Sequence, residues 1–376
     1  MTFEHLNLMK SLLDAVKREG YTTPTAIQHQ SIPHILDGKD LFGCAQTGTG
    51  KTAAFALPIL QMILLEQASG RKQGIRALVL APTRELAIQI HENFRSYASG
   101  TGIRTACIYG GVPQYTQVNR LKQGVDVLIA TPGRLLDLVA QRILDLASIR
   151  WFVLDEADRM LDMGFIDDIK KIVALLPKKR QTLFFAATLS PEIRTLSQRI
   201  LNAPVSVSIP PDSSVSGLIT QSVYYVKKED KRSLLQHVMH EQEIDHALIF
   251  TRTKRGADKV ARDLNKNGIK AEAIHGDKTQ NKRERSLNGF RNGMIRVLVA
   301  TDVASRGIDI DRLSHVINYE IPETPATYVH RIGRTGRAGA RGTALSFCTS
   351  DERAYLKGIH KLLNKEINVI RIHPFS

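Results

Sequence analysis

The segment with the clearest chemistry lies between a strand expected at residues 40–44 and a helix expected at residues 52–65. Its glycines let the backbone wrap around phosphate groups, and the helix N-terminus adds a partial positive charge. Lys51 can reach the β- and γ-phosphates of a nucleotide, and the Thr52 hydroxyl can bind Mg²⁺. Ala45 stands where such loops usually begin with Gly. The sequence predicts a phosphate-binding loop with Gln46, Thr47, Gly48, Thr49, Gly50, Lys51 and Thr52 as its binding residues.

A group of acidic residues follows a second expected strand, at residues 151–154. The strand delivers Asp155 and Glu156 at its carboxyl end, where open α/β sheets bind ligands. Asp155 suits Mg²⁺, and Glu156 suits orienting or deprotonating an attacking water. In isolation, residues 155–158 would read as a solvated helix start. Beside a phosphate-binding loop they predict nucleotide hydrolysis.

Short apolar runs recur along the chain and provide strands to position these groups. Each run is followed by a polar turn and then a helical stretch, which is typical of buried parallel strands separated by helices. We therefore expect an α/β fold with doubly wound parallel sheets. The runs fall at residues 77–81, 125–130, 151–154, 182–185, 246–250, 296–300, 315–319 and 343–347.

A stretch rich in proline and serine, residues 209–217, interrupts this pattern and has little apolar surface to bury. A complete series of strands and helices lies on each side of it. This position favours an interdomain linker over a long surface loop. We expect one domain at residues 1–208 and a second at residues 218–376, as a length of 376 residues also suggests.

Composition narrows the class of partner. The chain holds 52 Lys and Arg against 37 Asp and Glu, a formal net charge of +15, which favours nucleic acid or an anionic membrane. No apolar run approaches the roughly 18 residues of a membrane span, and residues 1–20 do not resemble a signal peptide. The 3 cysteines are too dispersed for a zinc site or a disulfide framework. We expect a cytoplasmic protein with no membrane partner.

The phosphate-binding loop, the Asp-Glu-Ala-Asp sequence at residues 155–158 and the basic two-part chain together resemble the DEAD-box RNA helicases. The resemblance extends over nearly the whole chain. Within the family, the sequence is most similar to the bacterial RhlE-like branch, through residues 275–280 and its compact core. The resemblance implies two RecA-like doubly wound parallel-sheet domains joined by a short linker. It also implies ATP and Mg²⁺ as cofactors, RNA as a largely sequence-independent partner, and a monomer.

The resemblance assigns adenine recognition to residues near the N-terminus. Residues 20–28 resemble the family's Q motif, in which Gln28 would read the adenine edge. An amide suits this role because it donates to N7 and accepts from the exocyclic amine. Phe3 matches the aromatic residue that packs near the base. Without the resemblance, Gln28 would be an ordinary helix-start residue and Phe3 a core residue.

The resemblance also implies a path for the RNA backbone along loops that follow the expected strands. Helix N-termini, hydroxyl groups and arginine are common phosphate binders, although a Thr-Pro-Gly sequence is also a common turn. The residues expected at RNA are Pro82, Thr83, Arg84, Gly111, Thr131, Pro132, Gly133 and Arg134 in the first domain, and Arg252, Gly276, Gln280, Arg283 and Thr301 in the second.

Residues 330–337 match the family's arginine-finger motif. The resemblance implies that Arg334 and Arg337 reach the γ-phosphate, where such fingers contribute about 10³–10⁵ in rate. It implies that His330 couples the two domains and that Gly307 and Asp309 touch the nucleotide. Without this context, an arginine-rich octapeptide could equally be a solvated basic surface.

One position departs from the family pattern. After the strand at residues 182–185 the family normally has Ser-Ala-Thr, whereas this chain has Ala186, Ala187 and Thr188. The missing hydroxyl would help tie this loop, with its expected catalytic residue Thr188, to the acidic motif around Asp158. One lost hydrogen bond costs about 0.5–1.5 kcal/mol. We expect retained RNA-stimulated ATP hydrolysis with impaired unwinding.

The favoured function is an ATP-dependent RNA helicase that separates short duplexes locally or remodels RNA–protein complexes. Three other functions stay open beside it. The first is an ATP-dependent RNA clamp or chaperone that barely unwinds, which Ala186 keeps open. The second is a DNA helicase or translocase of the same superfamily, which the Gln28 motif argues against. The third is a P-loop ATPase or kinase without nucleic acid, which the net charge of +15 argues against.

Overall fold

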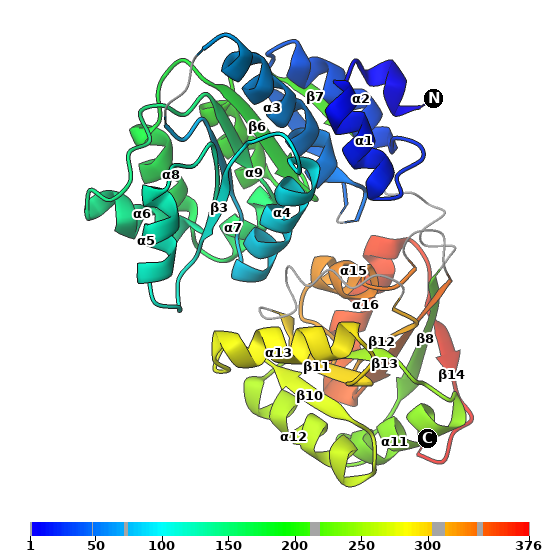
Figure 1. Ribbon diagram of the computed structural model, residues 1–376. Coiled ribbons are helices and arrows are strands. Elements are labelled where there is room, and N and C mark those ends of the chain that lie inside the picture. Colours follow the sequence, from blue (N-terminus) through cyan, green and yellow to red (C-terminus); the bar gives the residue numbers. More distant parts are fainter. Residues whose placement is uncertain are drawn as a thin grey trace. The chain divides into compact units, whose positions relative to one another are not determined.

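A computed structural model describes residues 2–46, 48–70, 74–210, 219–302, 313–336 and 341–375. The chain divides into two compact units, residues 1–211 (unit 1) and residues 212–376 (unit 2). Figure 1 shows that each unit is a sheet flanked by helices. Among the described residues, no helix combines the length and apolarity needed to span a bilayer.

Unit 1 is built on a seven-stranded parallel sheet with the order β3-β4-β2-β5-β6-β1-β7. Its central strands are continuous apolar runs because helices cover both faces of the sheet. The strands are β1 (Leu41–Cys44), β2 (Ala77–Leu80), β3 (Thr105–Ile108), β4 (Val127–Ala130), β5 (Trp151–Leu154), β6 (Gln181–Ala186) and β7 (Val205–Ser208).

Two hydrophobic cores form, one on each face of this sheet, because successive side chains of a strand point to opposite faces. Phe185 packs in the core beneath α2, α3 and α4, whereas its neighbour Phe184 packs in the core beneath α6 to α9. The helical elements are η1 (Phe3–Leu6), α1 (Lys10–Arg18), α2 (Ala26–Leu36), α3 (Lys51–Ala68), α4 (Arg84–Tyr97), α5 (Tyr115–Lys122), α6 (Pro132–Ala140), α7 (Ala157–Asp162), α8 (Ile166–Leu175) and α9 (Pro191–Ile200).

Unit 2 repeats this topology, with the strand order β10-β11-β9-β12-β13-β8-β14, which matches unit 1 position by position. The strands are β8 (Ile219–Tyr225), β9 (Ala247–Thr251), β10 (Ala271–Ile274), β11 (Val297–Thr301), β12 (His315–Asn318), β13 (Gly342–Cys348) and β14 (Asn368–Ile370). The helical elements are α11 (Lys231–Glu241), α12 (Lys254–Lys266), α13 (Gln280–Arg291), α15 (Pro325–Ile332), η2 (Ser350–Glu352) and α16 (Arg353–Leu363). The predicted fold class is confirmed.

Every apolar run named in the sequence analysis is a strand, but four strands were not predicted from the sequence. These are β7, β8, β10 and β14, which lie at or next to the sheet edges. In β7, buried and exposed residues alternate, so its Val-Ser-Val-Ser sequence gives only a weak signal. Residues 211–217 of the expected linker lie outside the described part of the chain.

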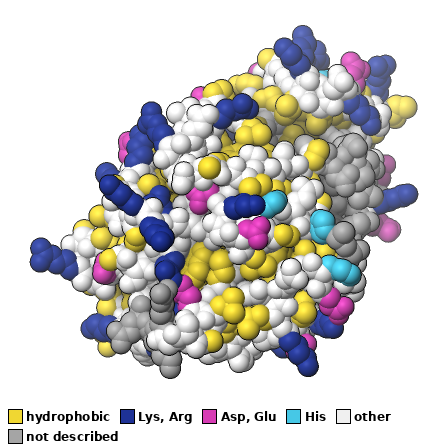
Figure 2. Space-filling view, turned by 90° about the horizontal axis from the view of Figure 1, so that it is seen from above, with side chains coloured by type: hydrophobic (Ala, Val, Ile, Leu, Met, Phe, Trp, Pro, Cys, Tyr) yellow, Lys and Arg dark blue, Asp and Glu magenta, His cyan; other side chains and the backbone are white. Residues whose placement is uncertain are grey.

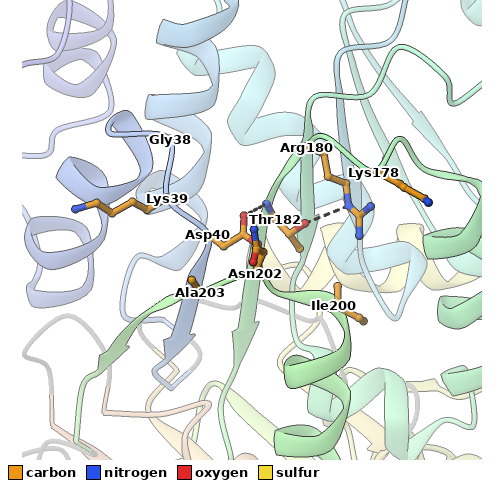
Figure 3. Close-up of a pocket in the computed structure, with 9 residues that line it drawn as sticks. All are labelled: Gly38, Lys39, Asp40, Lys178, Arg180, Thr182, Ile200, Asn202 and Ala203. Carbon is orange, nitrogen blue, oxygen red and sulfur yellow. Dashed lines mark hydrogen bonds between the residues drawn. The ribbon is translucent and has the colours of Figure 1, made fainter.

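The amino-terminal ends of the strands in unit 1 are held together by a buried carboxylate. Asp40 accepts hydrogen bonds from the backbone N–H groups of Thr182 and Asn202, each at 2.7 Å. It thereby joins the starts of β1 and β6 to the turn before β7. A cavity of about 280 Å³ borders this carboxylate (Figure 3). Parallel strands fixed at this end deliver their loops together at the opposite, carboxyl end.

Candidate active site

Three loops of predicted function meet at the carboxyl edge of the sheet in unit 1. They follow β1, β5 and β6, which are neighbours in the sheet. The registers pair Cys44 with Ala186 and Leu154 with Phe184, so the strands end at nearly the same level. The phosphate-binding loop, the acidic motif at residues 155–158 and the loop at residues 186–188 are therefore adjacent.

The phosphate-binding loop depends on glycine at two described positions. Gly48 and Gly50 have φ values of +86° and +90°, in the left-handed region that disfavours a Cβ atom. Lys51 begins α3, and its Nζ donates a hydrogen bond to the Ala45 carbonyl at 2.7 Å. This bond closes the loop and buries the ammonium group. Thr47 lies outside the described residues.

Gln28 joins the first turn of α2 to this loop. Its Oε1 accepts a hydrogen bond from the Thr25 backbone N–H at 2.9 Å, and its Nε2 donates to the Gly50 carbonyl at 3.1 Å. Each amide atom keeps one more hydrogen-bonding position, as adenine recognition would require. Phe3 is a core residue, 5% exposed and packed with Leu6 and Leu12. Its contact with a base stays a prediction.

Asp155 is a buried carboxylate next to the loop. Its Oδ1 accepts a hydrogen bond from the Glu156 backbone N–H at 3.0 Å. Burial raises its pKa to about 6, although the charge of Lys51 opposes the shift. Within the described ranges, no three His, Cys, Asp or Glu side chains form a metal-binding group. One carboxylate beside a phosphate loop fits Mg²⁺, which binds through one or two carboxylates together with substrate phosphates.

The carboxylate of Glu156 is paired with Arg159, a residue that the sequence analysis missed. The two side chains form an ion pair, and the residues are only 4% and 9% exposed. Glu156 caps α7 with a φ of +52°, an uncommon conformation for a residue with a side chain. In the sequence, Glu156 and Arg159 are three positions apart at the start of an expected helix. This spacing places two side chains on the same face of a helix and would have indicated the pair.

Asp158 ties the acidic motif to the loop that follows β6. Its Oδ2 accepts hydrogen bonds from the backbone N–H groups of Ala187, at 3.0 Å, and Thr188, at 2.9 Å. The Thr188 hydroxyl donates to the same oxygen at 2.9 Å. Ala186 is fully buried at the end of β6. The tie is therefore made without the missing serine hydroxyl, and a defect in unwinding stays a prediction.

The residues predicted to contact RNA in unit 1 lie at the ends of β2, β3 and β4. Thr83 caps α4, where its Oγ1 accepts from the Leu86 N–H at 3.3 Å, and Pro82 precedes it. Gly111 has a φ of +75°, and a Cβ atom there would lie 2.2 Å from Nη1 of Arg84. The guanidinium group of Arg84 thus rests against the glycine loop. Thr131, Pro132 and Gly133 begin α6.

Arg134 also holds this glycine loop. Its Nη1 donates to Oε1 of Gln117 at 3.2 Å, and its Nη2 donates to the Val112 carbonyl at 3.1 Å. Gln117, which the sequence analysis missed, also bonds the backbone N–H and carbonyl of Tyr109, at 3.2 and 3.1 Å. Both side chains fix the loop in place, and a contact of Arg134 with RNA stays a prediction.

In unit 2, Arg252 is engaged by acidic and carbonyl groups. Its Nη2 donates to Oε1 of Glu352 at 2.9 Å and to the Ile321 carbonyl at 3.1 Å. Glu352 is 2% exposed and accepts from Nζ of Lys231 at 2.7 Å. Lys231 is the buried partner of Glu352, whereas the Arg252 side chain is 34% exposed. Arg252 thus adds a second, partly exposed cation to this carboxylate, and its role in RNA binding stays a prediction.

The other residues predicted at RNA in unit 2 follow the carboxyl ends of β10 and β11. Thr301 is the last residue of β11, and Gly276 lies two residues beyond β10. Gln280 begins α13 and donates to Oε1 of Glu284 at 3.0 Å. Arg283, one turn later, is half-buried. The structure thus gathers these positions at one edge of the second sheet.

The arginine-rich motif begins on α15. His330 is exposed and Arg334 is 5% exposed. Arg331, which the sequence analysis passed over, is 2% exposed and pairs with both carboxylate oxygens of Asp302, at 2.6 and 2.7 Å. Its guanidinium carbon lies 5.0 Å from the ring centre of Phe250. Of the other predicted nucleotide contacts, the described part of the chain does not include Gly307, Asp309 and Arg337.

Comparison with known proteins agrees with this geometry. The DEAD/DEAH box helicase model matches residues 25–196, and the helicase conserved C-terminal domain model matches residues 230–339. An ATP-dependent RNA helicase CshA from Limosilactobacillus reuteri is 44% identical over 364 residues, which cover 96% of this chain and 72% of the relative. The chain belongs to the DEAD-box ATP-dependent RNA helicases. It is an enzyme that hydrolyses ATP and acts on RNA.

Further relatives and solved structures are similar over nearly the whole chain. The helicase DeaD of Haemophilus influenzae is 46% identical over 99% of this chain and 60% of its own length. The structure of S. cerevisiae Dbp5 bound to RNA and ADP BeF3 has a TM-score of 0.86 and 32% identity, covering 98% of this chain and 95% of that one. The structure of Mss116p bound to ssRNA and AMP-PNP has a TM-score of 0.90 and 28% identity, covering 100% and 80%. The RhlE-like branch stays a prediction.

Replacing Asp155 with Asn should stabilise the nucleotide-free helicase. The pKa of Asp155 rises from 3.8 to about 6 on folding, so the folded protein holds this proton more tightly than the unfolded chain does. Its contribution to stability therefore falls as the pH rises through this window. We expect Asp155→Asn to raise the free energy of unfolding at pH 7 by about 1–3 kcal/mol, with a much smaller gain at pH 4, where the carboxyl group of the folded protein is largely protonated.

Denaturant unfolding followed by the fluorescence of Trp151 measures this effect, because Trp151 is the 1 tryptophan of the chain and begins β5. The variant Asp37→Asn serves as the control, since its carboxylate is exposed. A loss of stability at pH 7 in Asp155→Asn would contradict the assignment of a desolvated carboxylate.

Proposed function

We propose that the hydrolytic site of this RNA helicase lies at the carboxyl ends of β1, β5 and β6. The observation that carries this proposal is the convergence of the phosphate-binding loop, the acidic motif and the loop held by Asp158 at one sheet edge. Lys51 would hold the β- and γ-phosphates of ATP, together with backbone N–H groups of residues 46–50. Gln28 and Phe3 would hold the adenine.

Thr52 and Asp155 are the residues that would hold Mg²⁺. The ion supplies positive charge to the phosphate oxygens when it is bound. A divalent cation would also offset the cost of burying the Asp155 carboxylate, whose pKa is raised by that burial. This match between an unfavourable buried charge and the expected ion supports the pair as the metal site.

Glu156 is the proposed general base. Its carboxylate would orient the attacking water and accept its proton as the water oxygen bonds to the γ-phosphorus. The bond from that phosphorus to the bridging oxygen of the β-phosphate would break, and ADP would leave. The ion pair with Arg159 holds this carboxylate in a buried position. The hydrogen bond from Thr188 to Asp158 would hold the loop at residues 186–188 in place beside the general base, Glu156.

Unit 2 would complete the hydrolytic site. Arg334 and Arg337 would stabilise the charge that develops on the transferred phosphoryl group, and His330 would couple the two units. Gly307 and Asp309 would contact the nucleotide. Residues 1–208 would then act as the ATP-binding domain and residues 218–376 as the arginine-finger domain, joined by a linker at residues 209–217.

RNA binding should be directed mainly at phosphate and 2′-hydroxyl groups, and thus be sensitive to salt and tolerant of sequence. Lys and Arg side chains are spread over the face that Figure 2 shows, with Asp and Glu among them. The net charge of +15 favours this partner. The proposed contacts are Pro82, Thr83, Arg84, Gly111, Thr131, Pro132, Gly133, Arg134, Arg252, Gly276, Gln280, Arg283 and Thr301. We place the protein in the cytoplasm as a monomer.

Steady-state ATP hydrolysis tests the proposed site directly. We expect single-stranded RNA, and not DNA of matched sequence, to stimulate hydrolysis. Glu156→Gln should lower the stimulated kcat by about 10²–10⁴, the usual effect of losing a general base, while ATP-dependent RNA binding persists. Glu229→Gln, at an exposed position, is the matched control. Stimulated hydrolysis that survives Glu156→Gln would contradict the assignment, and equal stimulation by DNA would indicate a general nucleic-acid motor.

A second candidate function, an ATP-dependent RNA clamp that unwinds weakly, is favoured by Ala186 alone. Restoring the hydroxyl with Ala186→Ser should leave ATP hydrolysis unchanged and raise the number of short duplexes separated per ATP about two- to tenfold, the equivalent of one hydrogen bond. Ala187→Ser is the control, since that residue already donates its backbone N–H to Asp158. Unchanged unwinding per ATP would contradict the clamp.

A further inference from the structure

An aromatic side chain without an intramolecular role stands at the start of α5. Tyr115 is 72% exposed, against 37% for Tyr21, the other tyrosine among the exposed large side chains of the described residues. Tyr21 bonds Tyr97 through its hydroxyl. Among the described residues, Tyr115 has neither a hydrogen bond from its hydroxyl nor a ring contact. Packing within unit 1 therefore does not account for an aromatic residue at this position.

The backbone around Tyr115 is fixed from both sides. On its C-terminal side, Gln117 bonds the backbone of Tyr109 through both amide atoms, at 3.2 and 3.1 Å. On its N-terminal side, the side-chain amides of Gln114 and Gln141 exchange hydrogen bonds at 3.1 and 3.3 Å. The backbone that carries the ring is therefore held in place before any ligand binds, which lowers the entropic cost of binding.

Tyr115 also lies close in sequence to a proposed RNA contact. It follows Gly111 by four residues, and Gly111 lies against the guanidinium group of Arg84. β3 and β4 are parallel, and Ile108 pairs with Ala130 at their carboxyl ends, so the loop that follows β3 leaves the sheet beside Thr131. Arg134, a proposed RNA contact, bonds the Val112 carbonyl and Oε1 of Gln117, so the segment that carries Tyr115 is joined to the proposed RNA path.

We propose that Tyr115 is a base-stacking subsite, on which one unpaired RNA base lies against the phenol ring. The subsite rests on the proposed RNA path along Arg84, Gly111 and Thr131. Stacking needs only the π-face of a base, so it adds affinity without sequence preference. The backbone contacts would fix the strand, and Tyr115 would fix the orientation of one nucleotide relative to it.

The affinity for a short single-stranded RNA, measured by fluorescence anisotropy with a non-hydrolysable ATP analogue, tests the subsite. Tyr115→Ala should weaken binding about 5- to 100-fold, the range for loss of one stacked base. Tyr115→Phe should bind within about twofold of the unchanged protein, because the ring and not the hydroxyl makes the contact. Equal affinity of Tyr115→Ala and Tyr115→Phe would overturn the proposal.

Abasic RNAs identify the stacked nucleotide. In a series of RNAs with one abasic site at each position in turn, the unchanged helicase should lose affinity when the abasic site falls at one particular position. Tyr115→Ala, which already lacks the stacking ring, should lose no further affinity at that position. A position-independent response, or the same response in both proteins, would overturn the subsite even if Tyr115→Ala binds weakly. Unchanged thermal unfolding of Tyr115→Ala, followed by Trp151 fluorescence, excludes a folding defect.

The variant Arg84→Ala separates this inference from the proposed RNA path. If Arg84→Ala weakens RNA binding and Tyr115→Ala does not, the path stands and the stacking subsite is wrong. If neither variant weakens binding while RNA still binds, the path itself is wrong and the subsite falls with it. If both weaken binding and the abasic position is found, the subsite is supported.

Discussion

The structure of the proposed hydrolytic site depends on the carboxylate of Asp158. One of its oxygens accepts three hydrogen bonds, two from backbone N–H groups and one from the Thr188 hydroxyl. Hydrogen bonds to an ionised acceptor are about twice as strong as neutral ones, and this acceptor is 7% exposed. Asp158 lies three residues after Asp155 and two after Glu156. Any shift of the loop at residues 186–188 is therefore transmitted to the carboxylates proposed to handle Mg²⁺ and water.

Several buried carboxylates in both units are compensated by ion pairs with arginine or lysine. Arg159 neutralises Glu156, Arg331 neutralises Asp302, and Arg252 shares Glu352 with Lys231. Such pairs fix loops at the carboxyl edges of the sheets, because breaking one leaves an uncompensated buried charge. The same sheet topology thus carries the proposed phosphate-binding loop in unit 1 and the buried ion pair of Arg331 with Asp302 in unit 2.

The sequence predicted what depends on local pattern. Continuous apolar runs located the central strands, and the glycines with Lys51 indicated the loop between β1 and α3 that is proposed to bind phosphate. The edge strand β7 gave no such signal, because two of its four residues face solvent. The roles of Arg331 and Gln117 were also out of reach, since their partners are set by the fold. Asp302 lies 29 positions from Arg331, and nothing local in the sequence indicates that the two side chains meet.

The most direct test of the link through Asp158 is a double-mutant cycle on the ratio of ATP hydrolysis rates with and without RNA. Asp158→Ala and Thr188→Ala should each lower this ratio, with Asp158→Ala lowering it roughly tenfold or more, since it removes several charge-assisted hydrogen bonds. The double variant should be no worse than Asp158→Ala alone, because the two residues act through one interaction. Additive losses, or an RNA stimulation that survives Asp158→Ala, would contradict the account.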